Sequence, residues 1–183
     1  MSLKKIKFIL IVLILYQTPL YSKSTTFNNI NAKNLSKYFS GIVAFENKNN
    51  SDALKFFGSS KVLIDKHDPY LKRYVYSLVL ENKVLQAINI VKNNENKSNV
   101  NFFDAYILLI SDSLKKNNFE KADFYLKKIT SFSSSDRFNL AILESLKQYI
   151  HVFKKNEILD NKKNLGKFSI ISETFQRCYL GDS

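Results

Sequence analysis

The sequence is poor in the residues that build disulfides, thiolate metal sites and turn-rich β-structures. Its 183 residues include one cysteine, four glycines and two prolines. A single cysteine cannot form an internal disulfide or a thiolate cluster, so Cys178 is expected to be a small apolar side chain or a partly exposed thiol. With 45% hydrophobic residues, the scarcity of glycine and proline favours one compact helical protein or a short helical repeat array.

Motifs for catalysis and metal binding are also missing. The two histidines, His67 and His151, have no second ligand three or four residues away. His67 lies in the polar turn LIDKHDP and is expected to be solvated, whereas His151 is expected to be partly buried on a helix. The sequence has no glycine-rich phosphate loop, nucleophile elbow or metalloprotease motif, and its acidic residues are scattered singly. We therefore expect a non-enzymatic protein without catalytic residues, metal or cofactor.

The formal net charge of +12 comes almost entirely from lysine. Lysine is abundant together with Asn, Ile, Phe and Tyr, which indicates an A/T-rich coding bias, so the charge by itself says little about function. Lysines and aromatic residues interleave in segments such as KRYVYSLVLENK, but an amphipathic helix with one buried face explains that spacing. We predict no nucleic-acid partner, although a cationic protein can associate with anionic polymers or lipid head groups at low salt.

The N-terminus has the parts of a bacterial secretory signal. Three lysines within the first seven residues precede the apolar run Phe8 to Tyr16, and the polar segment QTPLYSKS follows. The run is shorter than the roughly 20 residues that span a bilayer. Residues 1–24 are therefore predicted to be a signal peptide that exports the chain to the periplasm or cell envelope, with an uncleaved anchor as the alternative. Residues 25–33 form a polar linker.

Three later segments share one pattern, in which a polar turn containing Asn precedes an alanine with apolar neighbours at helical spacing. They are NNSDALKFFGSSKVL from Asn49, NKVLQAINIVKNNE from Asn82 and NNFEKADFYLKKI from Asn117. The alanines Ala53, Ala87 and Ala122 are 34 and 35 residues apart. A second amphipathic helix is expected before each segment, at Asn34 to Asn47, Pro69 to Asn82 and Asn101 to Asn117. The short turns between the paired helices predict antiparallel hairpins, in which alanine lets the helices approach closely.

This pattern resembles the tetratricopeptide repeat (TPR) family, whose period is about 34 residues. The resemblance covers residues 34–131 and implies an all-α fold, a right-handed α-solenoid of three to four antiparallel helix pairs. The resemblance implies that the helices of each repeat pack through Gly41, Ala53, Phe57, Ala87, Val91, Ala122 and Leu126, the repeat-packing positions. Lys37, Val75 and Ile110 depart from the family pattern. The alternative is an ordinary helical bundle in which three alanines fall into register by chance.

The pattern fades in residues 132–183, which we expect to form a degenerate fourth unit and a C-terminal cap. Ser135 or Asp136 is expected to cap a helix over Arg137 to Lys155, but Asn156 occupies the position expected for the next alanine. The last segment, KFSIISETFQRCYLGDS, is predicted to be a short amphipathic helix or strand. Its apolar residues do not make the polar outer face of an ordinary solenoid cap. The end is therefore an atypical cap or an open one, and an open end would form a dimer or aggregate through this C-terminal face.

The resemblance also implies a function, because the first helices of such hairpins line a groove that holds a segment of a partner. Carried over by position, the groove residues are Tyr38, Phe45, Lys72, Tyr76, Ser111 and Lys115. Lys72 and Lys115 would favour an acidic ligand. The sequence thus predicts a scaffold or adaptor that binds a protein or peptide in the periplasm or envelope. The alternative is an envelope-anchored basic protein that associates with the membrane surface through anionic lipid or with an anionic polymer.

Overall fold

The computed structural model describes residues 31–130, 136–164 and 166–181, which belong to one compact unit. Within these ranges the chain forms eight α-helices and two short 3-10 helices, and no strand. The all-α prediction is therefore confirmed for the described residues. The expected leader, most of the expected linker and the serine-rich residues 131–135 lie outside these ranges.

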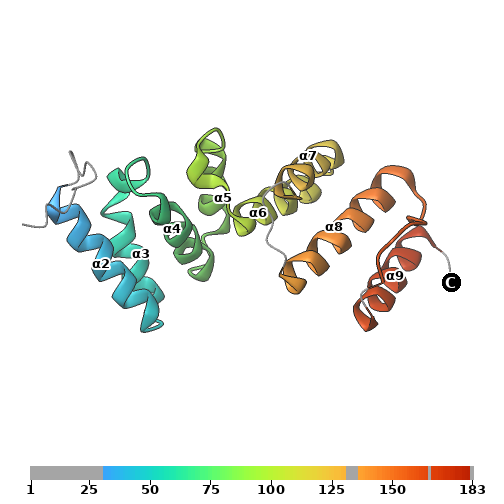
Figure 1. Cartoon of the computed structure of the whole chain (residues 1–183), viewed down its shortest axis with the longest axis horizontal. Helices are drawn as coiled ribbons and strands as arrows, with labels where there is room; N and C mark the ends of the chain where they lie inside the picture. The colour runs from blue at the N-terminus through green and yellow to red at the C-terminus, as the bar shows by residue number, and fades with distance from the viewer. Residues whose placement is uncertain (1–30, 131–135, 165, 182–183) are drawn as a thin grey trace, which may run out of the picture. The chain divides into compact units, whose positions relative to one another are not determined.

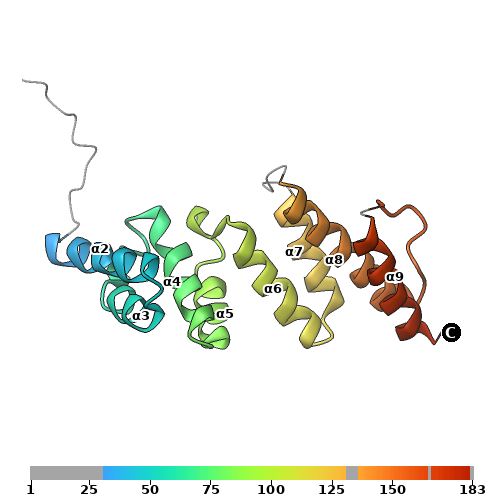
Figure 2. The same ribbon diagram turned by 90° about the horizontal axis from the view of Figure 1, so that it is seen from below.

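The helices follow one another as packed neighbours in chain order (Figure 1). The α-helices are α2 (Ala32–Glu46), α3 (Asn50–Gly58), α4 (Asp68–Leu80), α5 (Val84–Asn93), α6 (Phe103–Lys115), α7 (Phe119–Thr130), α8 (Arg137–Lys155) and α9 (Lys167–Leu180). The 3-10 helices are η1 (Lys61–Leu63) and η2 (Ser98–Val100). We call α2, α4, α6 and α8 the first helices, and α3, α5, α7 and α9 the second helices. Each second helix up to α7 packs against the first helix before it and the one after it, as Figure 2 shows for α7 between α6 and α8.

The turns that join α2 to α3, α4 to α5 and α6 to α7 have the same backbone structure. Each contains one residue in the left-handed region, with φ of 62° at Lys48, 57° at Asn82 and 54° at Asn117. In each turn the next residue's N–H donates to a carbonyl five residues earlier, at 2.8–2.9 Å: Asn49 to Ala44, Lys83 to Leu78, and Asn118 to Ser113. These are Schellman bonds, which satisfy carbonyl groups left without partners at a helix end. The same turn therefore recurs at intervals of 34 and 35 residues.

Small residues lie where the paired helices cross. Ala53, Ala87 and Ala122 are fully buried, as are Phe57 and Val91, and Leu126 is nearly so. Gly41 of α2 faces the Phe57 ring of α3 so closely that an added Cβ would lie 2.7 Å from the ring's Cε1 atom. The seven predicted repeat-packing positions therefore all lie in the core of the hairpins.

The fourth pair, α8 and α9, differs from the first three. Asn156, also left-handed with φ of 55°, ends α8 through a 2.8 Å bond from its N–H to the Val152 carbonyl. An irregular segment then precedes α9, so this pair has no short turn.

The α8–α9 contact is polar in its middle, where Gln176 Nε2 donates to Gln148 Oε1 at 3.2 Å and both side chains are buried. At its end the Tyr179 ring packs edge-on against Phe153, with centroids 4.9 Å apart. These contacts advance along both helices in the same direction, so α9 runs parallel to α8 and the expected antiparallel fourth pair is wrong. The bulky apolar side chains of α9 are instead exposed: Phe168, Ile170, Ile171, Phe175 and Tyr179.

Candidate partner-binding surface

The predicted groove residues lie on α2, α4 and α6, and five of the six reach solvent. Lys72, Ser111 and Lys115 are exposed, and Phe45 and Tyr76 are partly exposed. Tyr38 is the exception, because only 2% of its surface is exposed. Phe45 is alone on α2, whereas the other four solvent-accessible residues lie on α4 and α6, and we refer to Lys72, Tyr76, Ser111 and Lys115 as the first-helix surface.

Tyr38 is buried because residues near the start of α4 close over it. The Arg73 Nη1 atom donates to the Tyr38 hydroxyl at 2.8 Å, and the His67 ring packs edge-on against the Tyr38 ring with centroids 4.7 Å apart. Tyr38 therefore joins α2 to α4 and cannot act as a ligand contact. No spacing rule within α2 would reveal this burial, since the covering residues come from the next hairpin.

His67 is also less solvated than its polar turn predicts. Its packing on Tyr38 leaves it partly buried, and this corrects the expectation that it is a solvated turn residue. Burial, followed by the charge of Arg73, lowers the pKa of His67, and the charge of Asp68 opposes them only in part. His67 is therefore held in its neutral form as a packing residue.

Tyr76 connects α4 to α6, the first helices of the second and third hairpins. Its hydroxyl donates to Asp104 Oδ2 of α6 at 2.5 Å, and the Lys72 ammonium lies 5.5 Å from the centre of its ring. Burial and the neighbouring Asp104 carboxylate raise the pKa of Tyr76, so the phenol stays protonated and keeps donating. The hydroxyl is thus committed to Asp104, and the partly exposed ring is what remains for a partner.

The adjacent lysines 115 and 116 have different surroundings. Lys116 Nζ lies 2.9 Å from Asp112 Oδ2, which Lys92 Nζ also approaches to 2.5 Å. Burial alone would raise the pKa of Asp112, but hydrogen bonds from Lys92 and Lys116 outweigh it and hold the pKa below its usual value. Asp112 is therefore a buried carboxylate that pairs α5 with α6 and occupies Lys116. Among the described residues, no ion-pair partner lies within 4.0 Å of Lys115 or Lys72.

Lys72 is the more informative of these two cations. Lys115 lies in the last turn of α6, where the helix dipole itself favours a positive charge. Lys72 lies in the first half of α4, where the helix dipole does not favour a positive charge. An exposed, unneutralised ammonium beside a tyrosine ring can bind a carboxylate while the ring contacts an apolar part of the same ligand.

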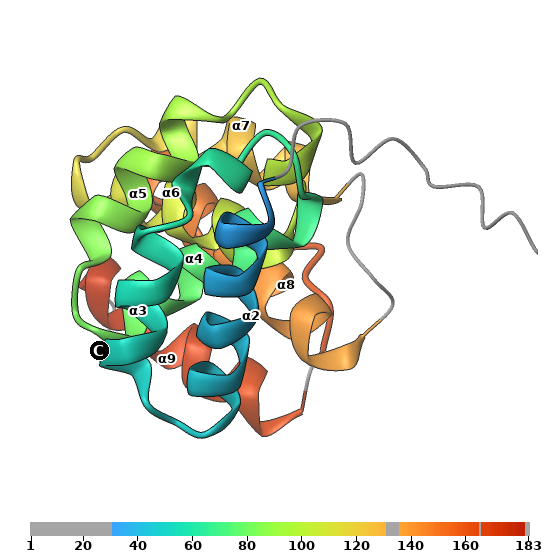
Figure 3. The same ribbon diagram turned by 90° about the vertical axis from the view of Figure 1, so that its left-hand side faces the viewer.

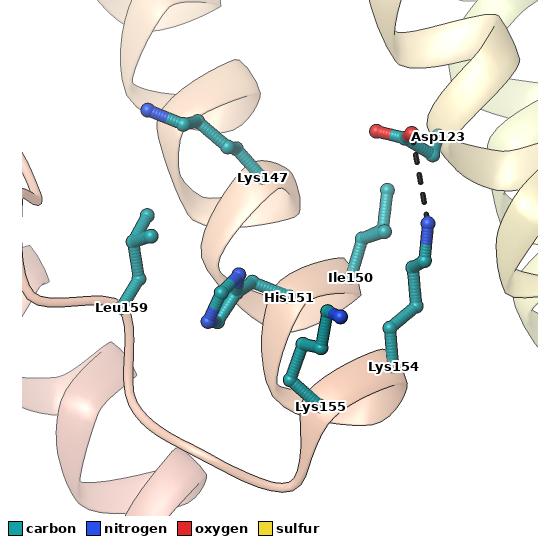
Figure 4. Close-up of a pocket in the computed structure, with 7 residues that line it drawn as sticks. All are labelled: Asp123, Lys147, Ile150, His151, Lys154, Lys155 and Leu159. Carbon is teal, nitrogen blue, oxygen red and sulfur yellow. Dashed lines mark ion pairs between the residues drawn. The ribbon is translucent and has the colours of Figure 1, made fainter.

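A second basic site, which the sequence analysis missed, lies beside α8 (Figure 4). Lys147, His151, Lys154 and Lys155 line a pocket of about 240 Å³ together with Asp123 and Leu159. Lys154 Nζ lies 3.0 Å from Glu120 Oε2 and 3.8 Å from Asp123 Oδ2, so α7 already neutralises this lysine. The spacing of positions 147, 151, 154 and 155 places them on one face of a helix, and this signal could have identified the pocket.

The described residues contain no group of three or more His, Cys, Asp or Glu side chains placed to hold a metal ion. None of the helices in the described ranges is long and apolar enough to cross a bilayer. Comparisons of the chain with known protein families, with curated proteins and with solved structures found no match.

Proposed function

We propose that this chain is a non-enzymatic scaffold of the TPR type, a right-handed α-solenoid that binds an acidic segment of a protein partner. The repeat architecture is supported by the Schellman turn that recurs at Lys48, Asn82 and Asn117. It is supported further by the fully buried alanines of the second helices. A fold made of repeated hairpins presents a continuous surface of first helices to a partner.

The observation that carries the binding proposal is the first-helix surface. Lys72 and Lys115 are exposed with no ion-pair partner among the described residues, and the Tyr76 ring lies beside Lys72. Ligands with carboxylates and at least one apolar side chain match this set. A partner segment of about 12 residues, extended at about 3.3 Å per residue, would be long enough to cross both α4 and α6.

Charge reversal tests the surface directly. In binding assays with Glu-rich and Asp-rich peptides that each carry an aromatic residue, Lys72→Glu combined with Lys115→Glu is expected to weaken binding by about tenfold or more. The matched control is Lys55→Glu with Lys121→Glu, which makes the same change of net charge on exposed residues of α3 and α7. If both double variants weaken binding equally, net charge rather than this surface holds the peptide.

We further propose that the scaffold acts in the periplasm or cell envelope, because residues 1–24 read as an export signal. A reporter enzyme that is active only outside the cytoplasm, fused after Ser24, is expected to be active. An inactive but fully expressed fusion would remove the export part of the proposal and leave the binding part unchanged.

A second candidate function is favoured by the basic pocket on α8, which fits an anionic lipid head group or polymer. Vesicles containing anionic lipid would then bind the chain through Lys147 and Lys155. Salt separates the candidates: about 0.3 M shortens the Debye length to several ångströms and would strip this association. Binding of a peptide through both charge and apolar contact would persist.

A further inference from the structure

The last helix, α9, is held by a different kind of contact from the other second helices. Each of α3, α5 and α7 buries apolar side chains, such as Ala122, Tyr125 and Ile129 in α7. The buried residues of α9 are Ser172 and Gln176, which are both polar. The helix lies beside α8, at the far end of the described unit from α2 (Figures 1 and 3). Burial of apolar surface, which drives most helix packing, therefore contributes little to holding α9 in place.

The large apolar side chains of α9 keep about half or more of their surface in solvent. Phe168, Ile171 and Phe175 are 47%, 55% and 64% exposed. An apolar contact with α8 occurs near the end of the helix, where the Tyr179 ring packs on Phe153, and Tyr179 is still 56% exposed. Moving α9 away from α8 would therefore expose little additional apolar surface.

Hydrogen bonds connect the middle of α9 to α8, and they leave one buried atom unpaired. Gln176 Nε2 donates to Gln148 Oε1 at 3.2 Å and to Ser172 Oγ at 3.0 Å. Gln176 is fully buried, and its Oε1 atom has no hydrogen-bond partner among the described residues. A buried carbonyl oxygen without a partner loses the hydrogen bonds that water would give it, which opposes the closed packing. Detachment of α9 would return this oxygen to water.

The connection between α8 and α9 also differs from the three Schellman turns. Residues 157–164 lead from α8 towards α9 without forming a helix. Gly166 precedes α9 with φ of 68°, and an added Cβ there would meet no atom within 4 Å. The segment is tied down by polar groups: Lys162 Nζ lies 2.5 Å from Glu173 Oε2, and the Lys163 N–H donates to Glu144 Oε1 at 3.1 Å. Water can replace such partners when the segment moves, so these contacts oppose opening only weakly.

We propose that α9 is a detachable cap, which opens from α8 as one unit while α2 to α8 stay folded. Local opening of this kind occurs in units that make few buried apolar contacts. Opening uncovers Ser145 and Gln148, the α8 side chains that meet Ser172 and Gln176 of α9. The chain thus has a closed and an open form. The first-helix surface lies on α4 and α6, so the opening of α9 does not depend on the proposed peptide ligand.

Amide hydrogen exchange of the purified full chain, followed by NMR, tests the proposal. Protection factors at residues 173–178 of α9 are expected to be nearly equal to one another and at least about 100-fold smaller than those in the interior of α6. Protection of α9 equal to that of α6 would overturn the proposal, because α9 would then open only when the whole chain unfolds. Protection that declines steadily towards Leu180 would also overturn it, because that pattern indicates fraying of the helix end.

A double variant tests whether the polar contact sets the opening. Gln148→Met with Gln176→Met replaces both amides by apolar side chains of similar shape and removes the unpaired oxygen. It is expected to raise the protection of α9 relative to α6 by about tenfold. The hydrogen bond that Gln148 Nε2 donates to Glu144 lies within α8, so its loss affects both forms.

Gln86→Met is the matched control, because it makes the same change at an exposed residue of α5. Its α9 protection relative to α6 is expected to equal that of the parent. A double variant with no more α9 protection than this control would overturn the proposal, because the buried amides would then not be what lets α9 open.

Discussion

Two helix glycines have different surroundings, and the difference predicts opposite effects of the same substitution. In Gly41→Ala the new methyl group would lie 2.7 Å and 2.8 Å from two atoms of the buried Phe57 ring. Overpacking of this kind costs about 1–3 kcal/mol, which exceeds the roughly 1 kcal/mol that alanine gains over glycine in a helix. In Gly58→Ala the new methyl group has no neighbouring atom within 4 Å, so this variant keeps the stability that alanine gains over glycine in a helix. Urea unfolding should therefore show Gly41→Ala less stable and Gly58→Ala as stable as the parent or more so.

The lowered pKa of His67 predicts that the folded protein loses stability on mild acidification. Its pKa is lowered in the folded chain by burial and by Arg73, whereas in the unfolded chain it protonates near its usual pKa of about 6.5. The unfolded state therefore binds more protons just below that pH, and stability falls as the pH drops through this window. The contribution of Asp112 acts at lower pH, because its pKa lies below the usual carboxyl value.

The matching measurement is the free energy of unfolding at several pH values between about 7.5 and 5. His67→Gln should lose less stability across this window than the parent, whatever its absolute stability. Equal losses in both proteins would show that His67 does not couple folding to pH.

At the scale of elements, the second helices differ in how they begin. Asn49 Oδ1 accepts a hydrogen bond from the Asp52 N–H at 3.2 Å, and Asn118 Oδ1 accepts one from the Lys121 N–H at 3.0 Å. Lys83 occupies the same place before α5 and forms no side-chain cap. Lys83→Asn should therefore add a cap and stabilise the protein by about 1 kcal/mol.

The control for this cap is Lys83→Ala, which removes the lysine without supplying an acceptor. Thermal unfolding should show a higher midpoint for Lys83→Asn than for Lys83→Ala. Equal midpoints would mean that the three turns are less alike than their backbone geometry indicates.

The elements that the sequence predicts well are those with a local signal. Apolar spacing and the Asp136 cap predict a helix over Arg137–Lys155, which is α8 as observed. Asn82 and Asn117 mark two turns, because Asn tolerates the left-handed region, whereas Lys48 gives no such signal at the first turn. Tyr38, by contrast, was assigned to the groove and is buried, because Arg73 and His67 of another hairpin cover it. The burial of such a residue depends on contacts between hairpins, which periodicity within one helix does not encode.

At the scale of the whole molecule, the positive charge becomes informative only when the ion pairs are known. Of the lysines discussed above, Lys92 and Lys116 pair with Asp112, and Lys154 pairs with Glu120 and Asp123. Lys72 and Lys115 have no such partner among the described residues. These ion pairs cancel within the fold and add nothing to the +12 net charge of the sequence, which is an excess of cations over carboxylates. Lys72 and Lys115 of the first-helix surface belong to the cations that no described carboxylate neutralises.

Peptide binding by the first-helix surface is tested most directly by chemical-shift mapping of the ¹⁵N-labelled protein during titration with an acidic peptide that carries one aromatic residue. We expect the largest shifts to fall on α4 and α6, centred on Lys72, Tyr76, Ser111 and Lys115, and to persist at about 0.3 M salt. Shifts confined to the α8 pocket around Lys147 and Lys155, or no saturable shifts at peptide concentrations up to about 1 mM, would contradict it.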